Sequence, residues 1–359
     1  PPPPPPPRPP RLNCRRQRQM CIRDRHWAFE GELTRRDSDG VFRLSSVFGA
    51  ETEDATQDRT IHEFTPRFIG HVPALNDTLL TIGSDLIDSD YHLASRFGDQ
   101  FNDQSQRSVY VHALIPATAV LDVTLGVRYA EVENSIRDSG DFALYPTGVQ
   151  VDDDLTVGTF GLSFRADDNW RLLLHADQNY RFAKVDEYLQ PAYTPEFAPI
   201  LLKTQKGLSL ETGFEWTSGG NSARFVVYKL ELENEIAFDP VNFANINLDD
   251  TERTGIITSA YWRMTKRAGL SASYSYTDAE VTSGAFAGRE VPFVAEHSGR
   301  VEADYMFTDS WQLYAEVVAI SERVFSGDFD NVLGKLPGYA VVNICLLYTS
   351  DAADECPAV

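Results

Sequence analysis

The chain has 359 residues and a formal net charge of −21, with 53 acidic against 32 basic side chains. This charge excludes a generic nucleic-acid-binding protein, because binding to phosphates needs a basic surface. The length would accommodate two or three soluble domains or one large barrel.

The two ends differ in character from the chain between them. A proline-rich run occupies residues 1–10, with no apolar segment behind it that would make a signal peptide. One nucleotide sequence encodes residues 15–24, and its reverse complement in a shifted frame encodes residues 346–354. This inverted repeat resembles a transposase-tagging sequencing adapter. We therefore expect 1–25 and 345–359 to be non-native sequence that lies outside the hydrogen-bond ladders of the fold.

All four cysteines lie within these two ends, at Cys14, Cys21, Cys345 and Cys356. The chain between them, 26–344, has no cysteine. This excludes disulfide scaffolds, cysteine zinc sites and cysteine nucleophiles from the part that we expect to carry the function.

Within 26–344 the dominant pattern is a two-residue alternation of apolar and polar side chains. In 121–129 the odd positions are apolar, and the even positions are polar or glycine. Such a strand has one apolar and one polar face, so we expect Arg128 to point inward and the apolar set to point outward into lipid. The outward set is Val123, Leu125, Val127 and Tyr129.

The alternation predicts a series of strands, most of them long for a soluble sheet. A tilted strand needs about 9–11 residues to cross the hydrocarbon of a membrane, so the lengths favour a transmembrane sheet. No apolar run approaches the roughly 18 residues of a transmembrane helix. The expected strands are 26–36, 41–50, 60–72, 77–88, 106–115, 119–133, 153–165, 169–182, 205–216, 222–235, 252–264, 268–279, 298–307, 311–322 and 338–344.

Short and long connections alternate between these strands. Short turns are expected at 116–118, 166–169, 217–221, 265–267 and 308–310. Long polar loops are expected at 134–152, 183–204, 236–251, 280–297 and 323–337. Short periplasmic turns opposite long extracellular loops are typical of outer-membrane barrels, whereas soluble sandwiches and propellers do not sort their loops in this way.

Four of the five tryptophans sit beside the short turns. Trp170 and Trp311 begin strands, and Trp216 and Trp262 end them. Tryptophan concentrates where a bilayer meets water, so these four residues predict a membrane-interface girdle. The alternative is that tryptophan is merely common at strand ends.

Several segments in order along the chain resemble landmarks of the TonB-dependent receptors. Residues 202–216 are similar to the family's "Leu-Lys-Pro-Glu-Lys … Glu-Leu-Gly-Phe-Glu" segment, with Thr204 and Gln205 in place of Pro and Glu. Further similar segments are 179–188, 245–255, 268–279, 289–294 and 336–343. The resemblance implies an all-β, antiparallel transmembrane β-barrel of about 22 strands, of which this chain would supply about 15.

The resemblance also implies the partners. Family members take up scarce nutrients such as iron–siderophores or vitamins, energised by the TonB–ExbB–ExbD complex acting through a TonB box and a plug domain. Neither the box nor the plug is visible in 26–344, so we expect a fragment truncated at both ends. The remaining partners implied are outer-membrane lipid with lipopolysaccharide and a small-molecule ligand, in the cell outer membrane of a Gram-negative bacterium. No cofactor is expected.

Acidic loops are the candidate ligand contacts, although charged loops are usually just solvated. The candidates are Asp152, Asp153, Asp154, Asp328 and Asp330. A passive outer-membrane porin remains an alternative, because its strands and girdle would look alike. An outer-membrane enzyme would need a nucleophile, histidine and acid together at one rim. His112 and His175 lie in expected strands without a serine motif, so we interpret the chain as non-enzymatic.

Overall fold

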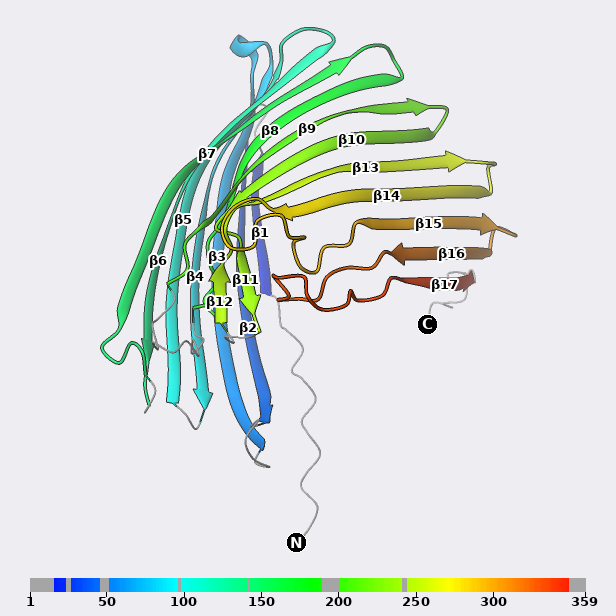
Figure 1. The fold of residues 1–359 in the computed structure, drawn as a ribbon. Coiled ribbons are helices and arrows are strands. Elements are labelled where there is room, and N and C mark those ends of the chain that lie inside the picture. Colours follow the sequence, from blue (N-terminus) through cyan, green and yellow to red (C-terminus); the bar gives the residue numbers. More distant parts are fainter. Residues whose placement is uncertain are drawn as a thin grey trace, which may run out of the picture.

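Figure 1 shows the computed structural model of the chain as one curved β-sheet. The structure describes residues 16–23, 27–45, 52–95, 98–140, 143–188, 201–240 and 244–348. Within these ranges, fifteen strands form one sheet in the order β1 to β10 and then β13 to β17, and β11 pairs with β12 in a separate two-stranded sheet. Neighbours in the large sheet pair antiparallel, so the chain runs back and forth across it.

The bounds of the elements follow the predicted alternation closely in the second half of the chain. The large sheet consists of β1 (Arg16–Arg23), β2 (Trp27–Ser45), β3 (Thr52–Val72), β4 (Thr78–Ser95), β5 (Gly98–Pro116), β6 (Leu121–Asp138), β7 (Val149–Arg165), β8 (Trp170–Arg181), β9 (Gln205–Ser218), β10 (Asn221–Glu233), β13 (Thr251–Arg263), β14 (Ala268–Val281), β15 (His297–Met306), β16 (Trp311–Ile320) and β17 (Tyr339–Tyr348). The small hairpin is β11 (Ile236–Asp239) and β12 (Ala244–Asn247), and a 3-10 turn, η1 (Pro73–Leu75), joins β3 to β4. No helix in the described ranges is long and apolar enough to cross a membrane.

Short turns and long loops alternate as predicted. The turns between β5 and β6, β7 and β8, β13 and β14, and β15 and β16 gather at one end of the sheet, opposite the long connections that follow β6, β8, β10, β14 and β16. The connection between β4 and β5 is short although it belongs to the loop end. These two strands are 18 and 19 residues long, so the strands themselves extend beyond the loop-side ends of their neighbours.

The sheet has one apolar and one polar face, as the alternation on β6 predicts. Leu125, Val127 and Tyr129 expose 45%, 51% and 39% of their surface, whereas Val123 is half-buried. A soluble protein would bury such a row, and a protein in lipid leaves it facing outward. On the opposite face, the Arg128 guanidinium donates hydrogen bonds to the Asp85 carboxylate and, over 2.7 Å, to the Ser108 hydroxyl.

Three expectations about the strands were wrong. The described parts of the segments 26–36 and 41–50 form one strand, β2, because residues 37–40 pair with 57–60 of β3 instead of turning. Residues 26 and 46–50 lie outside the described residues. Cross-strand backbone bonds are available to any non-proline residue, so a run of polar residues and glycine does not by itself end a strand. The expected loop 236–251 contains the β11–β12 hairpin.

The ends of the chain are the third correction. All of β1 pairs with residues 28–35 of β2, and residues 345–348 continue β17 against 311–314 of β16. The prediction that 1–25 and 345–359 lie outside the ladders is therefore wrong for these residues, since backbone pairing does not require a strand period in the side chains. Their non-native origin stays a prediction, and the rest of both ends lies outside the described residues.

The turn between β9 and β10 provides a first testable prediction. Ser218 and Asn221 are paired, and the two residues between them, Gly219 and Gly220, have φ angles of 59° and 84°. Positive φ at both positions defines the type I′ turn that suits the twist of a hairpin. We expect Gly219→Ala to lower the free energy of unfolding by about 1–2 kcal/mol, because a β-carbon is strained in the left-handed region.

The measurement for this turn is urea unfolding of the detergent-solubilised protein. Gly219→Asn is the control, because asparagine tolerates positive φ. No atom outside the neighbouring residues lies within 4 Å of a β-carbon at this position, so crowding does not contribute. Equal stability of the alanine and asparagine variants would show that the turn does not hold this conformation.

Candidate functional site

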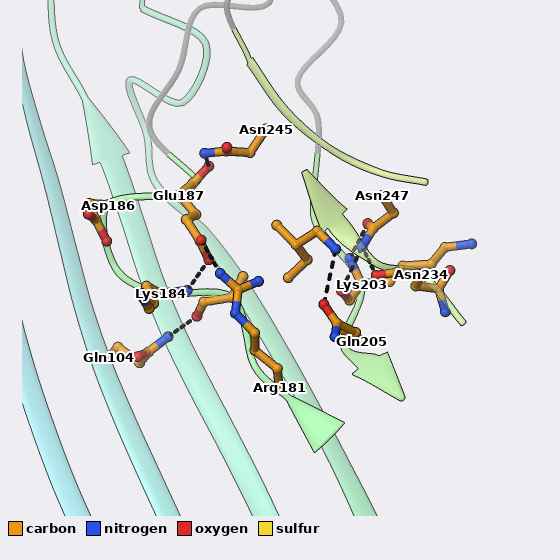
Figure 2. A network of polar contacts seen from close by, with 12 residues as sticks. Gln104, Arg181, Lys184, Asp186, Glu187, Lys203, Gln205, Asn234, Asn245 and Asn247 are labelled. Carbon is orange, nitrogen blue, oxygen red and sulfur yellow. Dashed lines mark hydrogen bonds and ion pairs between the residues drawn. The ribbon is translucent and has the colours of Figure 1, made fainter. Parts of the chain in front are cut away.

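A segment at the loop end of the polar face folds inward instead of projecting into solvent. It comprises residues 182–188, directly after β8, and we call it the strap (Figure 2). Four of its seven side chains are buried; they are Phe182, Ala183, Val185 and Tyr188. A charged loop is normally solvated, so this burial shows that the strap is packed against the rest of the loop end.

Buried amide side chains on β5 hold the strap in place. Asn102 is fully buried, and its Nδ2 donates a hydrogen bond of 2.8 Å to the Val185 carbonyl oxygen. Gln104 Nε2 donates to the Ala183 carbonyl oxygen over 2.8 Å and to Asn134 Oδ1 over 2.7 Å. These donors pair strap carbonyls that would otherwise be buried without a partner, a state that costs about 1–3 kcal/mol each.

Glu187 closes the strap on itself. Its carboxylate accepts a hydrogen bond from the Arg181 guanidinium at the end of β8, and its other oxygen accepts one of 2.8 Å from the Lys184 backbone N–H. The Glu187 carbonyl oxygen accepts a third bond, 3.1 Å long, from Asn245 Nδ2 on β12. The strap is therefore connected both to the sheet and to the small hairpin, as Figure 2 shows.

The small hairpin is in turn bonded to the start of β9. Asn247 accepts a hydrogen bond from the Lys203 N–H over 2.8 Å and donates one to the Lys203 carbonyl oxygen over 3.0 Å. Gln205 Oε1 accepts a bond of 3.2 Å from the Ile236 N–H. Strap, hairpin and the residues leading into β9 thus form one bonded unit at the loop end.

An apolar cluster lies beneath this unit. Its buried members are Tyr91, Ile136, Ala183, Val185, Tyr188 and Leu202. Burial raises the pKa of the Tyr188 phenol to about 12, with a smaller contribution from the Glu187 carboxylate. Loss of a proton here would place a charge in a cluster that excludes water.

The Tyr188 pKa predicts a pH dependence of stability. An unfolded tyrosine ionises near pH 10 and the folded one near 12, so the stabilisation is complete below pH 10 and is lost as the pH rises from 10 to 12. We expect Tyr188→Phe to resist alkaline unfolding better than the parent protein across this window. Tyrosinate absorbance, measured as the difference between the two proteins during titration, checks this. A difference signal with its midpoint near pH 10 would contradict the predicted burial.

The loops after β14 and β16 form a second bonded unit. Asn331 accepts a hydrogen bond of 2.7 Å from the Glu290 N–H and donates one of 3.1 Å back to the Glu290 carbonyl oxygen. Lys335 Nζ lies 2.8 Å from a Glu290 carboxylate oxygen, and this carboxylate raises the pKa of Lys335. The phenyl rings of Phe286 and Phe329 pack with their centroids 5.5 Å apart.

The predicted acidic candidates do not form one site. Asp152, Asp153 and Asp154 were expected as ligand contacts where the loop 134–152 meets the strand 153–165, but all three lie within β7, which begins at Val149. Asp152 and Asp154 are exposed on the same face as Tyr129, and Asp153 is half-buried on the opposite face. Alternation within the strand therefore separates them.

The other two candidates differ from each other. The Asp328 carboxylate is buried and accepts hydrogen bonds of 3.1 and 2.9 Å from the backbone N–H groups of Val332 and Leu333. Its role in the structure is to hold the loop. Asp330 is exposed. Sequence reasoning missed the strap, although its carbonyl partners Asn102 and Gln104 are polar residues on the inward period of β5.

The four turn-side tryptophans share one end and one face of the sheet. Trp170 pairs with Trp216 across β8 and β9, with ring centroids 6.5 Å apart. Trp262 is 55% exposed, and Trp311 is 41% exposed and contacts Tyr348 with centroids 4.7 Å apart. Their position agrees with the predicted girdle, whose contact with a membrane interface stays a prediction.

Two features of the described ranges bear on catalysis and metal binding: the arrangement of potential metal ligands, and the strand histidines His112 and His175. No group of three or more His, Cys, Asp or Glu side chains there is arranged to hold a metal ion. His112 lies beside Gly126, and His175 is opposite Glu211 of β9 in the strand register. Both histidines are on the polar face and are therefore directed away from lipid.

Comparison with known proteins agrees with this fold. The family described as "TonB dependent receptor-like, beta-barrel" matches residues 23–350. No curated protein matches the chain.

Solved structures of low sequence identity share the architecture. The ferric yersiniabactin uptake receptor FyuA from Yersinia pestis is 15% identical, with a TM-score of 0.73 over 91% of this chain and 52% of that one. The copper transporter OprC is also 15% identical, with a TM-score of 0.73 over 88% and 53%. The ferric citrate transporter FecA is 16% identical, with a TM-score of 0.72 over 92% and 52%. The chain thus spans about half the length of these structures.

Proposed function

The chain belongs to the TonB-dependent receptor β-barrel family. We propose that it forms part of the barrel wall and the loops of an outer-membrane receptor for the TonB-energised uptake of a nutrient. The cargo would be a scarce nutrient such as an iron–siderophore, a vitamin or a metal ion. The similar structures are named for ferric yersiniabactin, copper and ferric citrate. A cargo of this kind is too large or too dilute for efficient diffusion through a porin.

The observation that carries the proposal is the division of the sheet into a lipid-type face and an ordered, inward-folded loop end. Exposed apolar side chains such as Leu125 and Val127 cover the outer face of β6. A passive pore needs an open lumen. In this chain, by contrast, the buried amide side chains of Asn102 and Gln104 hold the strap inside the loop end through hydrogen bonds. Fixed polar groups at a mouth suit selective binding.

The partners follow from the same proposal. The TonB–ExbB–ExbD complex would supply energy through a plug domain and its TonB box, and outer-membrane lipid with lipopolysaccharide would surround the apolar face. Trp170, Trp216, Trp262 and Trp311 would mark the periplasmic interface of the membrane. The extracellular end would carry the strap, with Asp153 and Asp330 as acidic groups within reach of a ligand.

Uptake measurements test the proposal. Gram-negative cells expressing the gene product that contains this chain would be supplied with radioactive iron as the citrate or yersiniabactin complex, or with radioactive copper. We expect uptake of at least one cargo to fall to background when the gene for TonB is deleted or the proton gradient is collapsed. Uptake that persists in both conditions would indicate a passive porin instead, because diffusion needs no energy.

A further inference from the structure

Unpaired polar atoms gather around the strap. In the described part of the chain, eight buried side-chain nitrogen or oxygen atoms have no hydrogen-bond partner. Five of them belong to the strap, to residues that contact it or to a residue that packs against the cluster beneath it; these residues are Asp186, Asn102, Arg181, Arg59 and Tyr145. Buried polar groups are nearly always paired in a settled structure. This concentration indicates that the strap region is built to accept a further polar partner.

The register of the sheet places Arg59 at the edge of the strap. Arg59 on β3 is opposite Tyr91 on β4, and Tyr91 is opposite Asn102 on β5. The three side chains therefore form one row across the polar face, and Asn102 at the end of that row holds the Val185 carbonyl. At the other end, Asp186 of the strap lies 4.0 Å from the Arg59 guanidinium.

This ion pair is the loosest connection of the strap. The hydrogen bonds from Asn102 and Gln104 are 2.8 Å long. By contrast, Arg59 Nε and Asp186 Oδ1 are both without a hydrogen-bond partner. Guanidinium and carboxylate groups normally form two parallel hydrogen bonds at much closer range. Although Arg59 Nε and Asp186 Oδ1 are themselves buried, the two side chains as a whole retain 25% and 39% exposure, so a solute at the loop end can reach their outer atoms.

We propose that the Arg59–Asp186 contact is a latch, and that an anionic group of the ligand releases the strap by competing with Asp186 for Arg59. The Asp186 carboxylate is too far from the Arg59 guanidinium, at 4.0 Å, to form a hydrogen bond with it. A carboxylate of the ligand can approach more closely and form the two parallel hydrogen bonds that Asp186 does not form. The inference rests on the proposed function, because it assumes that a ligand enters through this mouth.

Release of the latch would be transmitted beyond the strap. Glu187, the next residue, is bonded to Asn245 on β12, and Asn247 of the same strand is bonded to Lys203 before β9. Movement of residue 186 therefore displaces the hairpin or breaks the Asn245 bond. The latch thus couples an anion at Arg59 to the position of the β11–β12 hairpin.

A thiol introduced at Val185 reports the position of the strap, because Val185 is fully buried when the strap is seated. Val185→Cys would be made in the whole receptor with its native cysteines changed to serine, and labelled on intact cells with a membrane-impermeant maleimide. We expect Asp186→Asn to accelerate labelling about fivefold. Asp152→Asn is the matched control, since it removes the same charge from the exposed face of β7 that carries no part of the strap, and it should leave the rate unchanged.

Citrate serves as the anionic probe, compared with sodium chloride at equal ionic strength. We expect citrate to accelerate labelling when Arg59 is present and to have no effect in Arg59→Gln. An unchanged rate in Asp186→Asn overturns the latch, and a citrate effect that persists in Arg59→Gln or is absent from the parent overturns anion sensing. Ala183→Cys repeats the test at a second buried position, in case Val185→Cys disturbs packing. Labelling requires neither uptake nor TonB, so its failure is distinguishable from failure of the proposed function.

Discussion

Gly83→Val is expected to destabilise the protein by about 3 kcal/mol, and Tyr110→Ala in the same chain is expected to recover most of this loss. Gly83 on β4 is directly opposite Tyr110 on β5, whose ring lies across the glycine. A β-carbon on residue 83 would overlap the Tyr110 ring and hydroxyl, and the three nearest atoms that it would meet all belong to this side chain. The conflict can therefore be removed by removing one ring.

A second glycine provides the contrast. Gly255 on β13 lies beneath the Tyr228 ring in a similar way, but a β-carbon there would also overlap the Tyr276 carbonyl oxygen of the neighbouring backbone. Backbone cannot rotate away as a side chain can. We expect Gly255→Val to be at least as destabilising as Gly83→Val, and we expect no rescue by Tyr228→Ala.

Urea unfolding of the four single and two double variants in detergent measures both cases. Gly40→Val is the control, since a β-carbon there would find its nearest neighbour, Gln57 Cβ, at 3.9 Å. The centroid of the Tyr110 ring also lies 4.4 Å from the Arg128 guanidinium carbon, so Tyr110→Ala alone should cost about 1 kcal/mol through the lost cation–π contact. If Gly83→Val and its double variant are equally unstable, the ring is not the source of the conflict.

The alternation of apolar and polar residues along the chain predicted the antiparallel sheet with two unlike faces. It does so because outward side chains of a membrane barrel contact lipid, whereas inward side chains contact water or polar groups. On β6 the outward positions 125, 127 and 129 are exposed and apolar, and the polar face carries Arg128 with its partners. Turn chemistry located the short connections, as at Gly219 and Gly220. Where the strands extend beyond the lipid, as in β2, this distinction vanishes and the prediction broke one strand into two.

The burial of the strap at the loop end could not be predicted from the sequence, for a different reason. Burial of the strap depends on Asn102 and Gln104, which are 79 or more residues away in sequence. A short segment with Lys184, Asp186 and Glu187 has the composition of a solvated loop, and only tertiary hydrogen bonds make it a buried one. Asp328 was likewise predicted as a candidate ligand contact, but its carboxylate accepts hydrogen bonds from backbone N–H groups four and five residues further on.

Cells that express only residues 26–344 are expected to take up no ligand, although the complete receptor should transport it. Strands β2 and β17 would be the edges of the sheet in that fragment, since each then has a neighbour on one side only. Within hydrocarbon every unpaired backbone N–H or C=O costs several kcal/mol, so an open sheet cannot remain as a monomer in lipid. The apolar β17, with Ile344 72% exposed, would pair with other copies.

Two measurements on the fragment separate this expectation from its alternatives. Size-exclusion chromatography in detergent should show large oligomers, and radioactive cargo should remain at the level of cells without the protein. Uptake by 26–344 that persists without TonB would instead mean that the strands close into a passive pore. Energised uptake needs a mechanical connection to the periplasm that a sheet of strands alone does not supply. Transport by the complete receptor should therefore depend on both TonB and the proton gradient, and the fragment should show neither form of entry.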